Sequence, residues 1–206
     1  MKNIQNEYIP AGRFKVGRKS PQIFQACLGT CLGVALYDQE RKAGGLIHIL
    51  LPSPWRDTDY EPDSPGKYAS TGIPKLIDEL TRMGCTTKAL KATIAGGALV
   101  GPVSRIDLGL DIGGHSLDIA HRILKEQGIE IIRSETGGFF ASTLELNMLT
   151  GETKIAPTWE TGIAPSTIAP VSDSDAIMAT IDNLQPIPQT ALKILRMFNQ
   201  DDHSID

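Results

Sequence analysis

The spacing of apolar and polar positions predicts strands and helices over the first three quarters of the chain. Apolar residues that alternate with polar ones, and short apolar runs, favour β-strands. Such stretches lie at residues 8–18, 23–28, 34–37, 46–51, 89–94, 129–133, 143–148 and 153–155. Apolar residues three or four positions apart predict amphipathic helices at residues 71–83 and 117–127. The pattern predicts an α/β fold with mostly antiparallel strands and two principal helices.

Glycine, proline and capping residues mark the ends of these elements. Residues 38–45 are polar and glycine-rich, so we expect a turn between the neighbouring strands. Residues 52–67 contain four prolines and predict a long surface loop. We expect Pro74 in the first turn of its helix, where no backbone donor is lost. Ser116 is the expected N-cap of the second helix.

The composition changes after residue 156. Residues 157–171 are rich in proline and threonine and predict a linker. Residues 172–206 return to apolar residues at helical spacing. We therefore expect a main domain at residues 1–156, a linker at 157–171 and a helical segment at 172–206.

Charge and composition argue against several functional classes. The formal charge of −4 and the absence of basic runs longer than two residues give no nucleic-acid footprint. No stretch approaches the ~18 apolar residues of a membrane span, and the first residues lack the apolar core of a signal peptide. An odd, sparse set of cysteines fits a reducing compartment better than a disulfide framework. We expect a cytoplasmic protein without a metal or cofactor.

Cys31 and His48 are the candidate catalytic pair. Gly29 and Gly33 flank the cysteine, which permits a sharp turn and close approach of a substrate. A thiol attacks an amide carbon only as a thiolate and therefore needs a base. Direct antiparallel pairing of Cys31 with His48 places the turn centre inside the polar segment 38–45, and a shift of two positions keeps both on one face.

By pattern alone, a second interpretation of this pair stays open. A cysteine in an apolar stretch is commonly a small core residue, and a histidine among isoleucines is commonly a satisfied core polar group. We interpret Cys27 and Cys85 as structural. Glycine-rich segments around residues 95–98 and 109–114 lack the lysine and serine or threonine of a phosphate loop.

Several ordered motifs resemble the chemoreceptor glutamine deamidase (CheD) family. Residues 28–34, Leu-Gly-Thr-Cys-Leu-Gly-Val, are similar to its Leu-Gly-Ser-Cys-Val motif, and residues 44–52 are similar to its Gly-Gly-x-x-His-x-x-Leu-Pro motif. Residues 65–69, 91–98 and 136–138 match further family segments. The likeness extends over most of residues 10–155.

The resemblance implies deamidation of chemoreceptor glutamines to glutamate, with Cys31 as nucleophile and His48 as base. It implies a layered α/β sandwich with a mixed, mostly antiparallel sheet. The implied partners are the cytoplasmic helices of chemoreceptors and a CheC-type phosphatase. Our candidate substrate-binding or oxyanion-binding residues are Gly29, Thr30, Gly33, Gly96 and Gly97.

The chain departs from the family pattern at several positions. Some members have a catalytic threonine six residues before the cysteine, where this chain has Gln25. We take Gln25 as the candidate third catalytic residue, since its amide oxygen can accept a hydrogen bond from an imidazole. Residues 139–142, Phe-Phe-Ala-Ser, replace an arginine-bearing segment, and His115 and Ser116 stand where the family often has arginine and asparagine.

The sequence carries one further resemblance and leaves two alternative functions open. Residues 184–195 resemble the opening of an HDOD signalling domain, which is much longer than the remaining chain. A binding module that kept the fold, regulating a phosphatase or receptor, is the alternative to an enzyme. A transglutaminase or peptidase is a third possibility, and measuring ammonia release from a receptor-derived peptide separates these functions.

Overall fold

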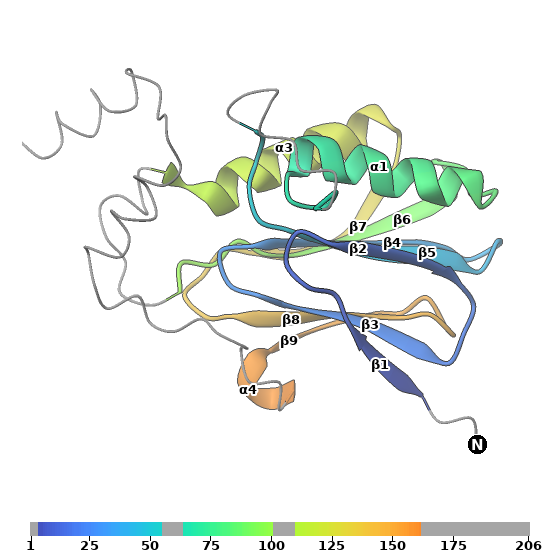
Figure 1. Ribbon diagram of the computed structural model, residues 1–206, viewed down its shortest axis with the longest axis horizontal. Helices are drawn as coiled ribbons and strands as arrows, with labels where there is room; N and C mark the ends of the chain where they lie inside the picture. Colours follow the sequence, from blue (N-terminus) through green and yellow to red (C-terminus); the bar gives the residue numbers. More distant parts are fainter. Residues whose placement is uncertain (1–3, 55–63, 101–109, 162–206) are drawn as a thin grey trace, which may run out of the picture. The chain divides into compact units, whose positions relative to one another are not determined.

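Two β-sheets stack face to face, and two helices cover the outer face of one of them (Figure 1). The computed structural model describes residues 4–54, 64–100 and 110–161. Apart from Leu110, these residues belong to one compact unit. The arrangement confirms the predicted layered α/β sandwich with mixed, mostly antiparallel strands.

The smaller sheet has the strand order β1-β3-β8-β9. Its strands are β1 (Gln5–Tyr8), β3 (Gln22–Leu28), β8 (Ser142–Asn147) and β9 (Thr153–Pro157). The larger sheet has the order β2-β5-β4-β6-β7. Its strands are β2 (Phe14–Arg18), β5 (Ala43–Ile49), β4 (Leu32–Asp38), β6 (Leu90–Gly96) and β7 (Glu130–Thr136). The pairs β1–β3 and β6–β7 are parallel, and all other pairs are antiparallel.

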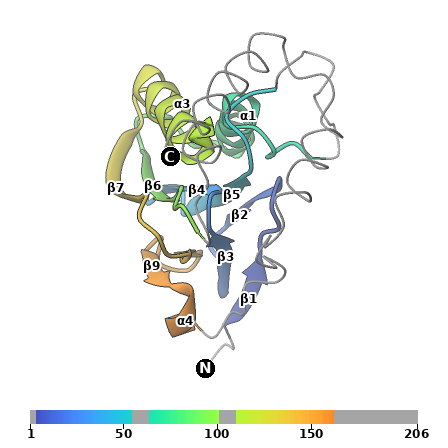
Figure 2. The same cartoon turned by 90° about the vertical axis from the view of Figure 1, so that its left-hand side faces the viewer.

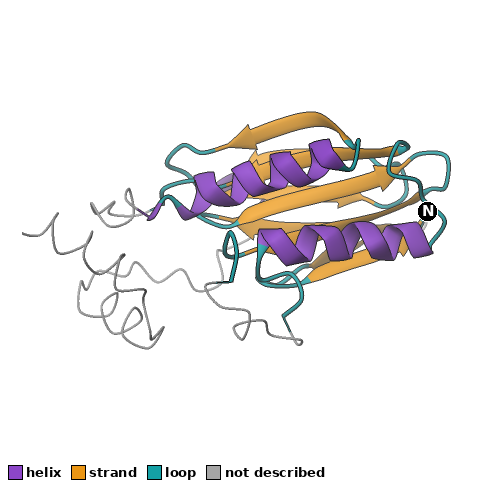
Figure 3. Ribbon diagram, turned by 90° about the horizontal axis from the view of Figure 1, so that it is seen from above, coloured by secondary structure: helices purple, strands orange, loops and turns teal. Residues whose placement is uncertain are grey.

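Helices α1 (Ala69–Arg82) and α3 (Ile112–Glu126) lie side by side across the larger sheet (Figure 3). Strand alternation sends one set of side chains toward these helices and the next set toward the smaller sheet. The helix-side core includes Leu36, Ile47 and Leu76. The core between the sheets includes Phe24 and Leu144. A strand residue of the larger sheet therefore faces either the helices or the smaller sheet, and the site described below lies on the side of the smaller sheet.

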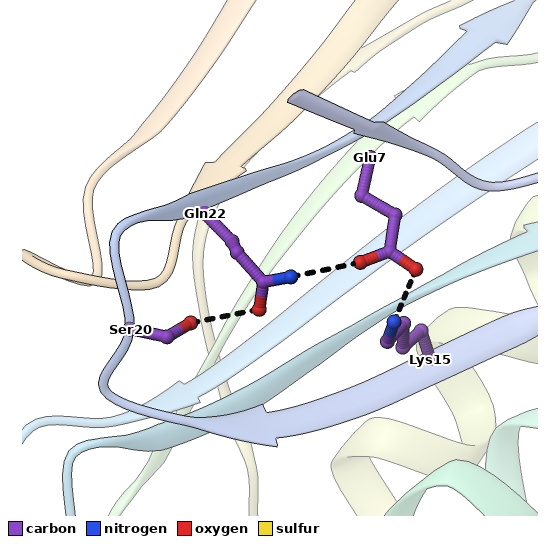
Figure 4. A network of polar contacts seen from close by, with 4 residues as sticks. All are labelled: Glu7, Lys15, Ser20 and Gln22. Atoms are coloured by element: carbon purple, nitrogen blue, oxygen red, sulfur yellow. Dashed lines mark hydrogen bonds and ion pairs between the residues drawn. The ribbon is translucent and has the colours of Figure 1, made fainter. Parts of the chain in front are cut away.

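A polar network joins the two sheets near the N-terminus (Figure 4). Glu7 of β1 forms an ion pair with Lys15 of β2, and its other oxygen accepts a hydrogen bond of 3.2 Å from Gln22 of β3. Ser20 donates a 2.9 Å hydrogen bond to the Gln22 amide oxygen. The network holds β1 at the edge of its sheet, and the segment after β1 reaches the site described below.

Three predicted boundaries differ from the structure. The expected strand at residues 8–18 is two strands in different sheets, because the segment turns at residues 10–13 with Gly12 at a φ of +77°. Pro74 lies beyond the first turn of α1, since Tyr68 is the N-cap. Ser116 is buried inside α3, and Asp111 caps that helix by accepting from the Gly114 N–H.

The early start of α3 follows from close packing. A Cβ on Gly113 would lie 2.7 Å from the Gly97 carbonyl oxygen, so glycine lets the first turn approach the segment after β6. The first turn of α3 therefore lies beside that segment. Its two glycines belong to the helix rather than to a preceding loop. Figure 2 shows α3 next to α1 on the outer side of the larger sheet.

The predicted linker falls mainly outside the described residues. β9 ends at Pro157, and α4 (Thr158–Thr161) follows where the linker was expected to begin. The predicted helical segment at residues 172–206, with its HDOD-like stretch, lies entirely outside the described residues. None of the described helices is long and apolar enough to cross a membrane.

Candidate active site

Cys31 lies one residue before β4, and continuing the β4–β5 register makes it a diagonal neighbour of His48. Gly33 lies opposite His48, and Leu32 lies opposite Ile49. The register is shifted by two positions from direct pairing of Cys31 with His48, which preserves the shared face. Diagonal neighbours in such a pair lie about 7–8 Å apart. The hairpin predicted from the sequence therefore differs from the observed one by an even number of residues, which leaves the two side chains on the same face of the sheet.

Both side chains belong to the layer between the two sheets. Leu46, two residues before His48, and Ala35, four residues after Cys31, are core residues of that layer. Cys31 is partly buried and packs against the same core. His48 is 3% exposed. The site lies at the end of the sandwich where β3 leads into β4.

The turn after β1 holds His48 through three hydrogen bonds. The Ile9 carbonyl lies 3.0 Å from His48 Nδ1. The Gly12 N–H donates to the His48 carbonyl at 2.8 Å, and the His48 N–H donates to the Arg13 carbonyl at 2.9 Å. The Ile9 N–H in turn donates to the Gln25 carbonyl at 2.8 Å. This chain of contacts fixes both the backbone and the ring of His48.

The hydrogen bond to Ile9 determines the tautomer of His48. A carbonyl oxygen can only accept, so Nδ1 carries the proton and Nε2 of the neutral ring has a free lone pair. Burial lowers the pKa of His48, and the Ile9 hydrogen bond opposes that shift. Nε2 is buried and has no hydrogen-bond partner among the described residues, Cys31 included. The ring is a neutral base with its accepting nitrogen unused.

The backbone around Cys31 is fixed by the segment that follows β6. The Gly97 N–H donates to the Cys31 carbonyl, and the Ala98 N–H donates to the Gly29 carbonyl, both at 2.8 Å. Gly96 has a φ of +100°, and a Cβ there would lie 2.3 Å from the Cys31 carbonyl oxygen. Glycine is required at this position for the two segments to meet.

The Cys31 thiol is protonated in this substrate-free arrangement. Burial raises the pKa of Cys31 to about 11, with a smaller contribution from the neighbouring Cys27 thiol. Burial also raises the pKa of Cys27 and of Cys85. The pair is therefore a thiol and a neutral imidazole, and a base must remove the thiol proton before attack.

The five candidate oxyanion-binding or substrate-binding residues have different structural roles. Gly33 lies within β4, and a Cβ there would meet Leu28 at 2.7 Å, so it permits close packing of the sheets. The N–H of Gly97 is engaged by Cys31, and Gly96 supplies the required backbone conformation. In the described part of the chain, no backbone hydrogen bond uses the N–H of Thr30 or Cys31. Those two N–H groups are therefore the candidate donors for an oxyanion.

Comparison with known proteins now places the chain in a family. The family model "CheD chemotactic sensory transduction" matches residues 50–157, more than half of the 206 residues. The chain belongs to the CheD family. The "Probable chemoreceptor glutamine deamidase CheD" of Methanococcus vannielii is 36% identical over 147 residues, covering 71% of this chain and 92% of that protein. The predicted family is confirmed.

A second relative supports the same placement. The "Chemoreceptor glutamine deamidase CheD" of Thermotoga maritima is 34% identical over 144 residues, covering 70% of this chain and 87% of that protein. The matched segment of the family model begins two residues after His48. The roles of Cys31 and His48 therefore rest on the geometry around them.

Gln25 does not have the position expected of a third catalytic side chain in this CheD-family protein. Its neighbours on β3, Phe24 and Ala26, face the core between the sheets. Strand alternation directs Gln25 to the opposite face. Ile9 occupies Nδ1 of His48, and Nε2 has no partner among the described residues, so the Gln25 amide does not orient the ring. Gln25 supports the site only through its carbonyl bond to Ile9.

Replacing Gln25 with alanine is expected to change the rate of ammonia release by less than about threefold. A lost second-shell partner of a functional histidine typically costs about 10- to 100-fold. Gln25→Ala keeps the backbone bond to Ile9 and should escape that cost. A tenfold loss at an unchanged melting temperature would restore Gln25 as the orienting residue.

Replacing Gly96 with alanine is expected to remove activity by displacing Cys31. The new Cβ would force the Cys31 carbonyl away, and the φ of +100° adds strain on the order of 1–3 kcal/mol. Gly84→Ala is the matched control, because Gly84 has a φ of +90° with nothing within 4 Å of its Cβ. Urea midpoints should fall for both variants, whereas only Gly96→Ala should lose ammonia release. Equal activity in the two variants would contradict this role of Gly96.

Proposed function

We propose that this chain is a cysteine-dependent deamidase that converts glutamine side chains of chemoreceptors to glutamate. The supporting observation is the buried His48 ring, whose protonated Nδ1 is bound by Ile9 and whose Nε2 is an unused acceptor on the face shared with Cys31. A satisfied core histidine would have both ring nitrogens engaged. The family and the names of the relatives supply the substrate class.

The proposed reaction consumes water and releases ammonia. Nε2 of His48 takes the thiol proton as the Cys31 sulfur attacks the amide carbon of the glutamine. The N–H groups of Thr30 and Cys31 bind the developing oxyanion. The imidazolium gives its proton to the departing nitrogen, and ammonia leaves behind a thioester. Water then attacks the thioester carbon while Nε2 takes its proton, the C–S bond breaks, and the imidazolium returns the proton to sulfur, which releases glutamate and restores the thiol. No metal or cofactor takes part in this scheme.

The first step requires movement of the Cys31 side chain. Nε2 has no hydrogen bond to sulfur in the substrate-free arrangement. Catalytic hydrogen bonds are often long before substrate binds and tighten in the complex. The diagonal placement leaves a gap that a change of the cysteine rotamer reduces.

The test uses a purified cytoplasmic fragment of a chemoreceptor as substrate. The expected result is ammonia release together with conversion of specific glutamines to glutamate, located by mass spectrometry. Added primary amine distinguishes transglutamination, since an amine adduct would replace glutamate, and chain cleavage would identify a peptidase. Receptor binding without any glutamine conversion would favour the regulatory binding module instead.

We also propose two features that rest on the family resemblance. The substrate helices lie on the cytoplasmic side of a chemoreceptor, so the protein acts in the cytoplasm. A CheC-type phosphatase is a second partner, and co-elution of the two purified proteins from a sizing column tests it. We retain the organisation into a deamidase domain at 1–156, a linker at 157–171 and a helical segment at 172–206 as a proposal.

A further inference from the structure

The connection between β7 and β8 crosses from one sheet to the other at the same end of the sandwich as the connection between β3 and β4 (Figure 1). Cys31 lies in that second connection. The Gly137 N–H donates to the Gly96 carbonyl, and the Leu99 N–H donates to the Gly138 carbonyl, both at 2.9 Å. The next segment, residues 96–98, is bonded directly to the turn that carries Cys31. Two hydrogen-bonded spacings of about 4.8 Å place this connection about 10 Å from the Cys31 backbone.

Two phenylalanines in this connection are largely exposed. Phe139 is 68% exposed and Phe140 is 69% exposed, the highest values among the large apolar residues that the structure describes. The backbone on either side is fixed, since Gly137 and Gly138 are bonded to residues 96–99 and the Ala141 carbonyl accepts from the Thr158 N–H at 3.1 Å. The segment 137–141 contains no charged residue. A paired, exposed aromatic surface on a fixed backbone is typical of a protein-binding site.

We propose that Phe139 and Phe140 form an apolar dock for the helix that carries the target glutamine. This inference rests on the proposed function, because the connection is hydrogen-bonded to the segment that holds the turn carrying Cys31, so a polypeptide bound at Cys31 can also contact it. On an α-helix, residues four or seven positions from the glutamine lie on the same face, about 6 or 10 Å along the axis. The longer of these distances is similar to the separation of about 10 Å between the backbone of this connection and that of Cys31. The dock therefore selects glutamines that have large apolar residues, rather than charged ones, one or two turns away.

The test compares two receptor-derived helical substrates that differ only beside the glutamine. One has leucine four and seven positions away, and the other has serine there. The double variant Phe139→Ser with Phe140→Ser should lower kcat/KM on the leucine substrate by at least about tenfold, through KM, with kcat within about twofold. On the serine substrate it should match the unmodified protein. Phe139→Leu with Phe140→Leu should restore the preference for leucine, because it keeps the surface apolar.

Ile132→Ser is the matched surface control. Ile132 is 59% exposed on β7, and its five-residue separation from Gly137 corresponds to about 16 Å along the strand. This variant should keep both KM values. An equal loss of kcat on both substrates, or no change in substrate preference, would overturn the dock. The dock would also be overturned if the unmodified protein were a dimer and the double serine variant were a monomer, because Phe139 and Phe140 would then bind a second copy of the chain.

Failure of the proposed function has a different signature. If the unmodified protein converts neither substrate nor the intact receptor fragment, the deamidase proposal fails and the dock fails with it. If the unmodified protein converts both substrates equally well, the deamidase proposal stands and only the dock is overturned.

Discussion

Replacing Cys31 with alanine is expected to abolish ammonia release, a loss of at least about a thousandfold in kcat. The variant has no sulfur to form the thioester, and the backbone donors and His48 alone cannot supply a nucleophile. Folding should be preserved, because Cys31 is only partly buried and alanine fits the same space. Receptor binding should also persist, which separates chemistry from recognition.

The matched control is Cys27→Ala. Cys27 lies on β3 between the core residues Ala26 and Leu28 and is not part of that core, although its thiol makes a small contribution to the pKa of Cys31. Ammonia release by Cys27→Ala should stay within about twofold of the unmodified protein. Residual turnover by Cys31→Ala above that of a heat-denatured sample, or loss of turnover in Cys27→Ala, would show that Cys31 is not the nucleophile.

The protonation state of Cys31 gives the first step its pH dependence. A thiol with a pKa of about 11 is ionised in about one molecule per thousand at pH 8. The site therefore does not store a thiolate and imidazolium pair, and His48 must accept the proton as the sulfur attacks. The rate of Cys31 alkylation without substrate should keep rising with pH beyond the range where ordinary thiols reach a plateau.

The hairpin that joins the catalytic pair could be predicted because its parity depends only on local sequence. The polar segment at 38–45 limits where the turn can lie, whereas every residue of β4 and β5 is buried, so the apolar pattern does not by itself select a face. Direct pairing and the observed register differ by two positions, and both keep Cys31 and His48 on one face. The β-branched and apolar runs likewise located most strands to within a few residues.

The contact that sets the tautomer of His48 could not be predicted in the same way. Ile9 acts through its backbone carbonyl, which has no side-chain signature, and it lies 39 residues from His48 in the sequence. The available signal was the turn at residues 10–13, which splits the expected strand at 8–18 into two strands in different sheets. The residues before Gly12 form β1, which pairs in parallel with β3 rather than with a strand of the larger sheet.

The role predicted for Gln25 stays a prediction, and the strand geometry explains why its side chain makes no described contact with the His48 ring. Residues 29–31 carry the chain from the smaller sheet to the larger one, so β3 and β4 do not share one alternation. Six positions before Cys31, the side chain points away from the core between the sheets, while the backbone carbonyl still reaches Ile9. A family position can therefore contribute through its backbone, whichever side chain it carries.

Replacing His48 with asparagine is expected to lower kcat by about 10²- to 10⁴-fold, the usual contribution of a general base. Asparagine has an amide N–H that can still donate to the Ile9 carbonyl, but it has no basic nitrogen in place of Nε2. In the unmodified protein, activity should fall in acid as Nε2 becomes protonated. Burial lowers the pKa of His48, so this fall should have its midpoint below 6.5, the ordinary value for histidine.

The same pKa shift makes stability depend on pH, with a sign that the variant tests. The unfolded chain takes up a proton on His48 near pH 6.5, whereas the folded chain takes it up only at lower pH. The folded state therefore binds fewer protons in this range, and stability declines as the pH falls below 6.5. Urea midpoints measured between pH 7.5 and about pH 5 should fall more for the unmodified protein than for His48→Asn. Equal pH dependence in the two proteins, with kcat unchanged in the variant, would identify His48 as a structural residue and require another base for Cys31.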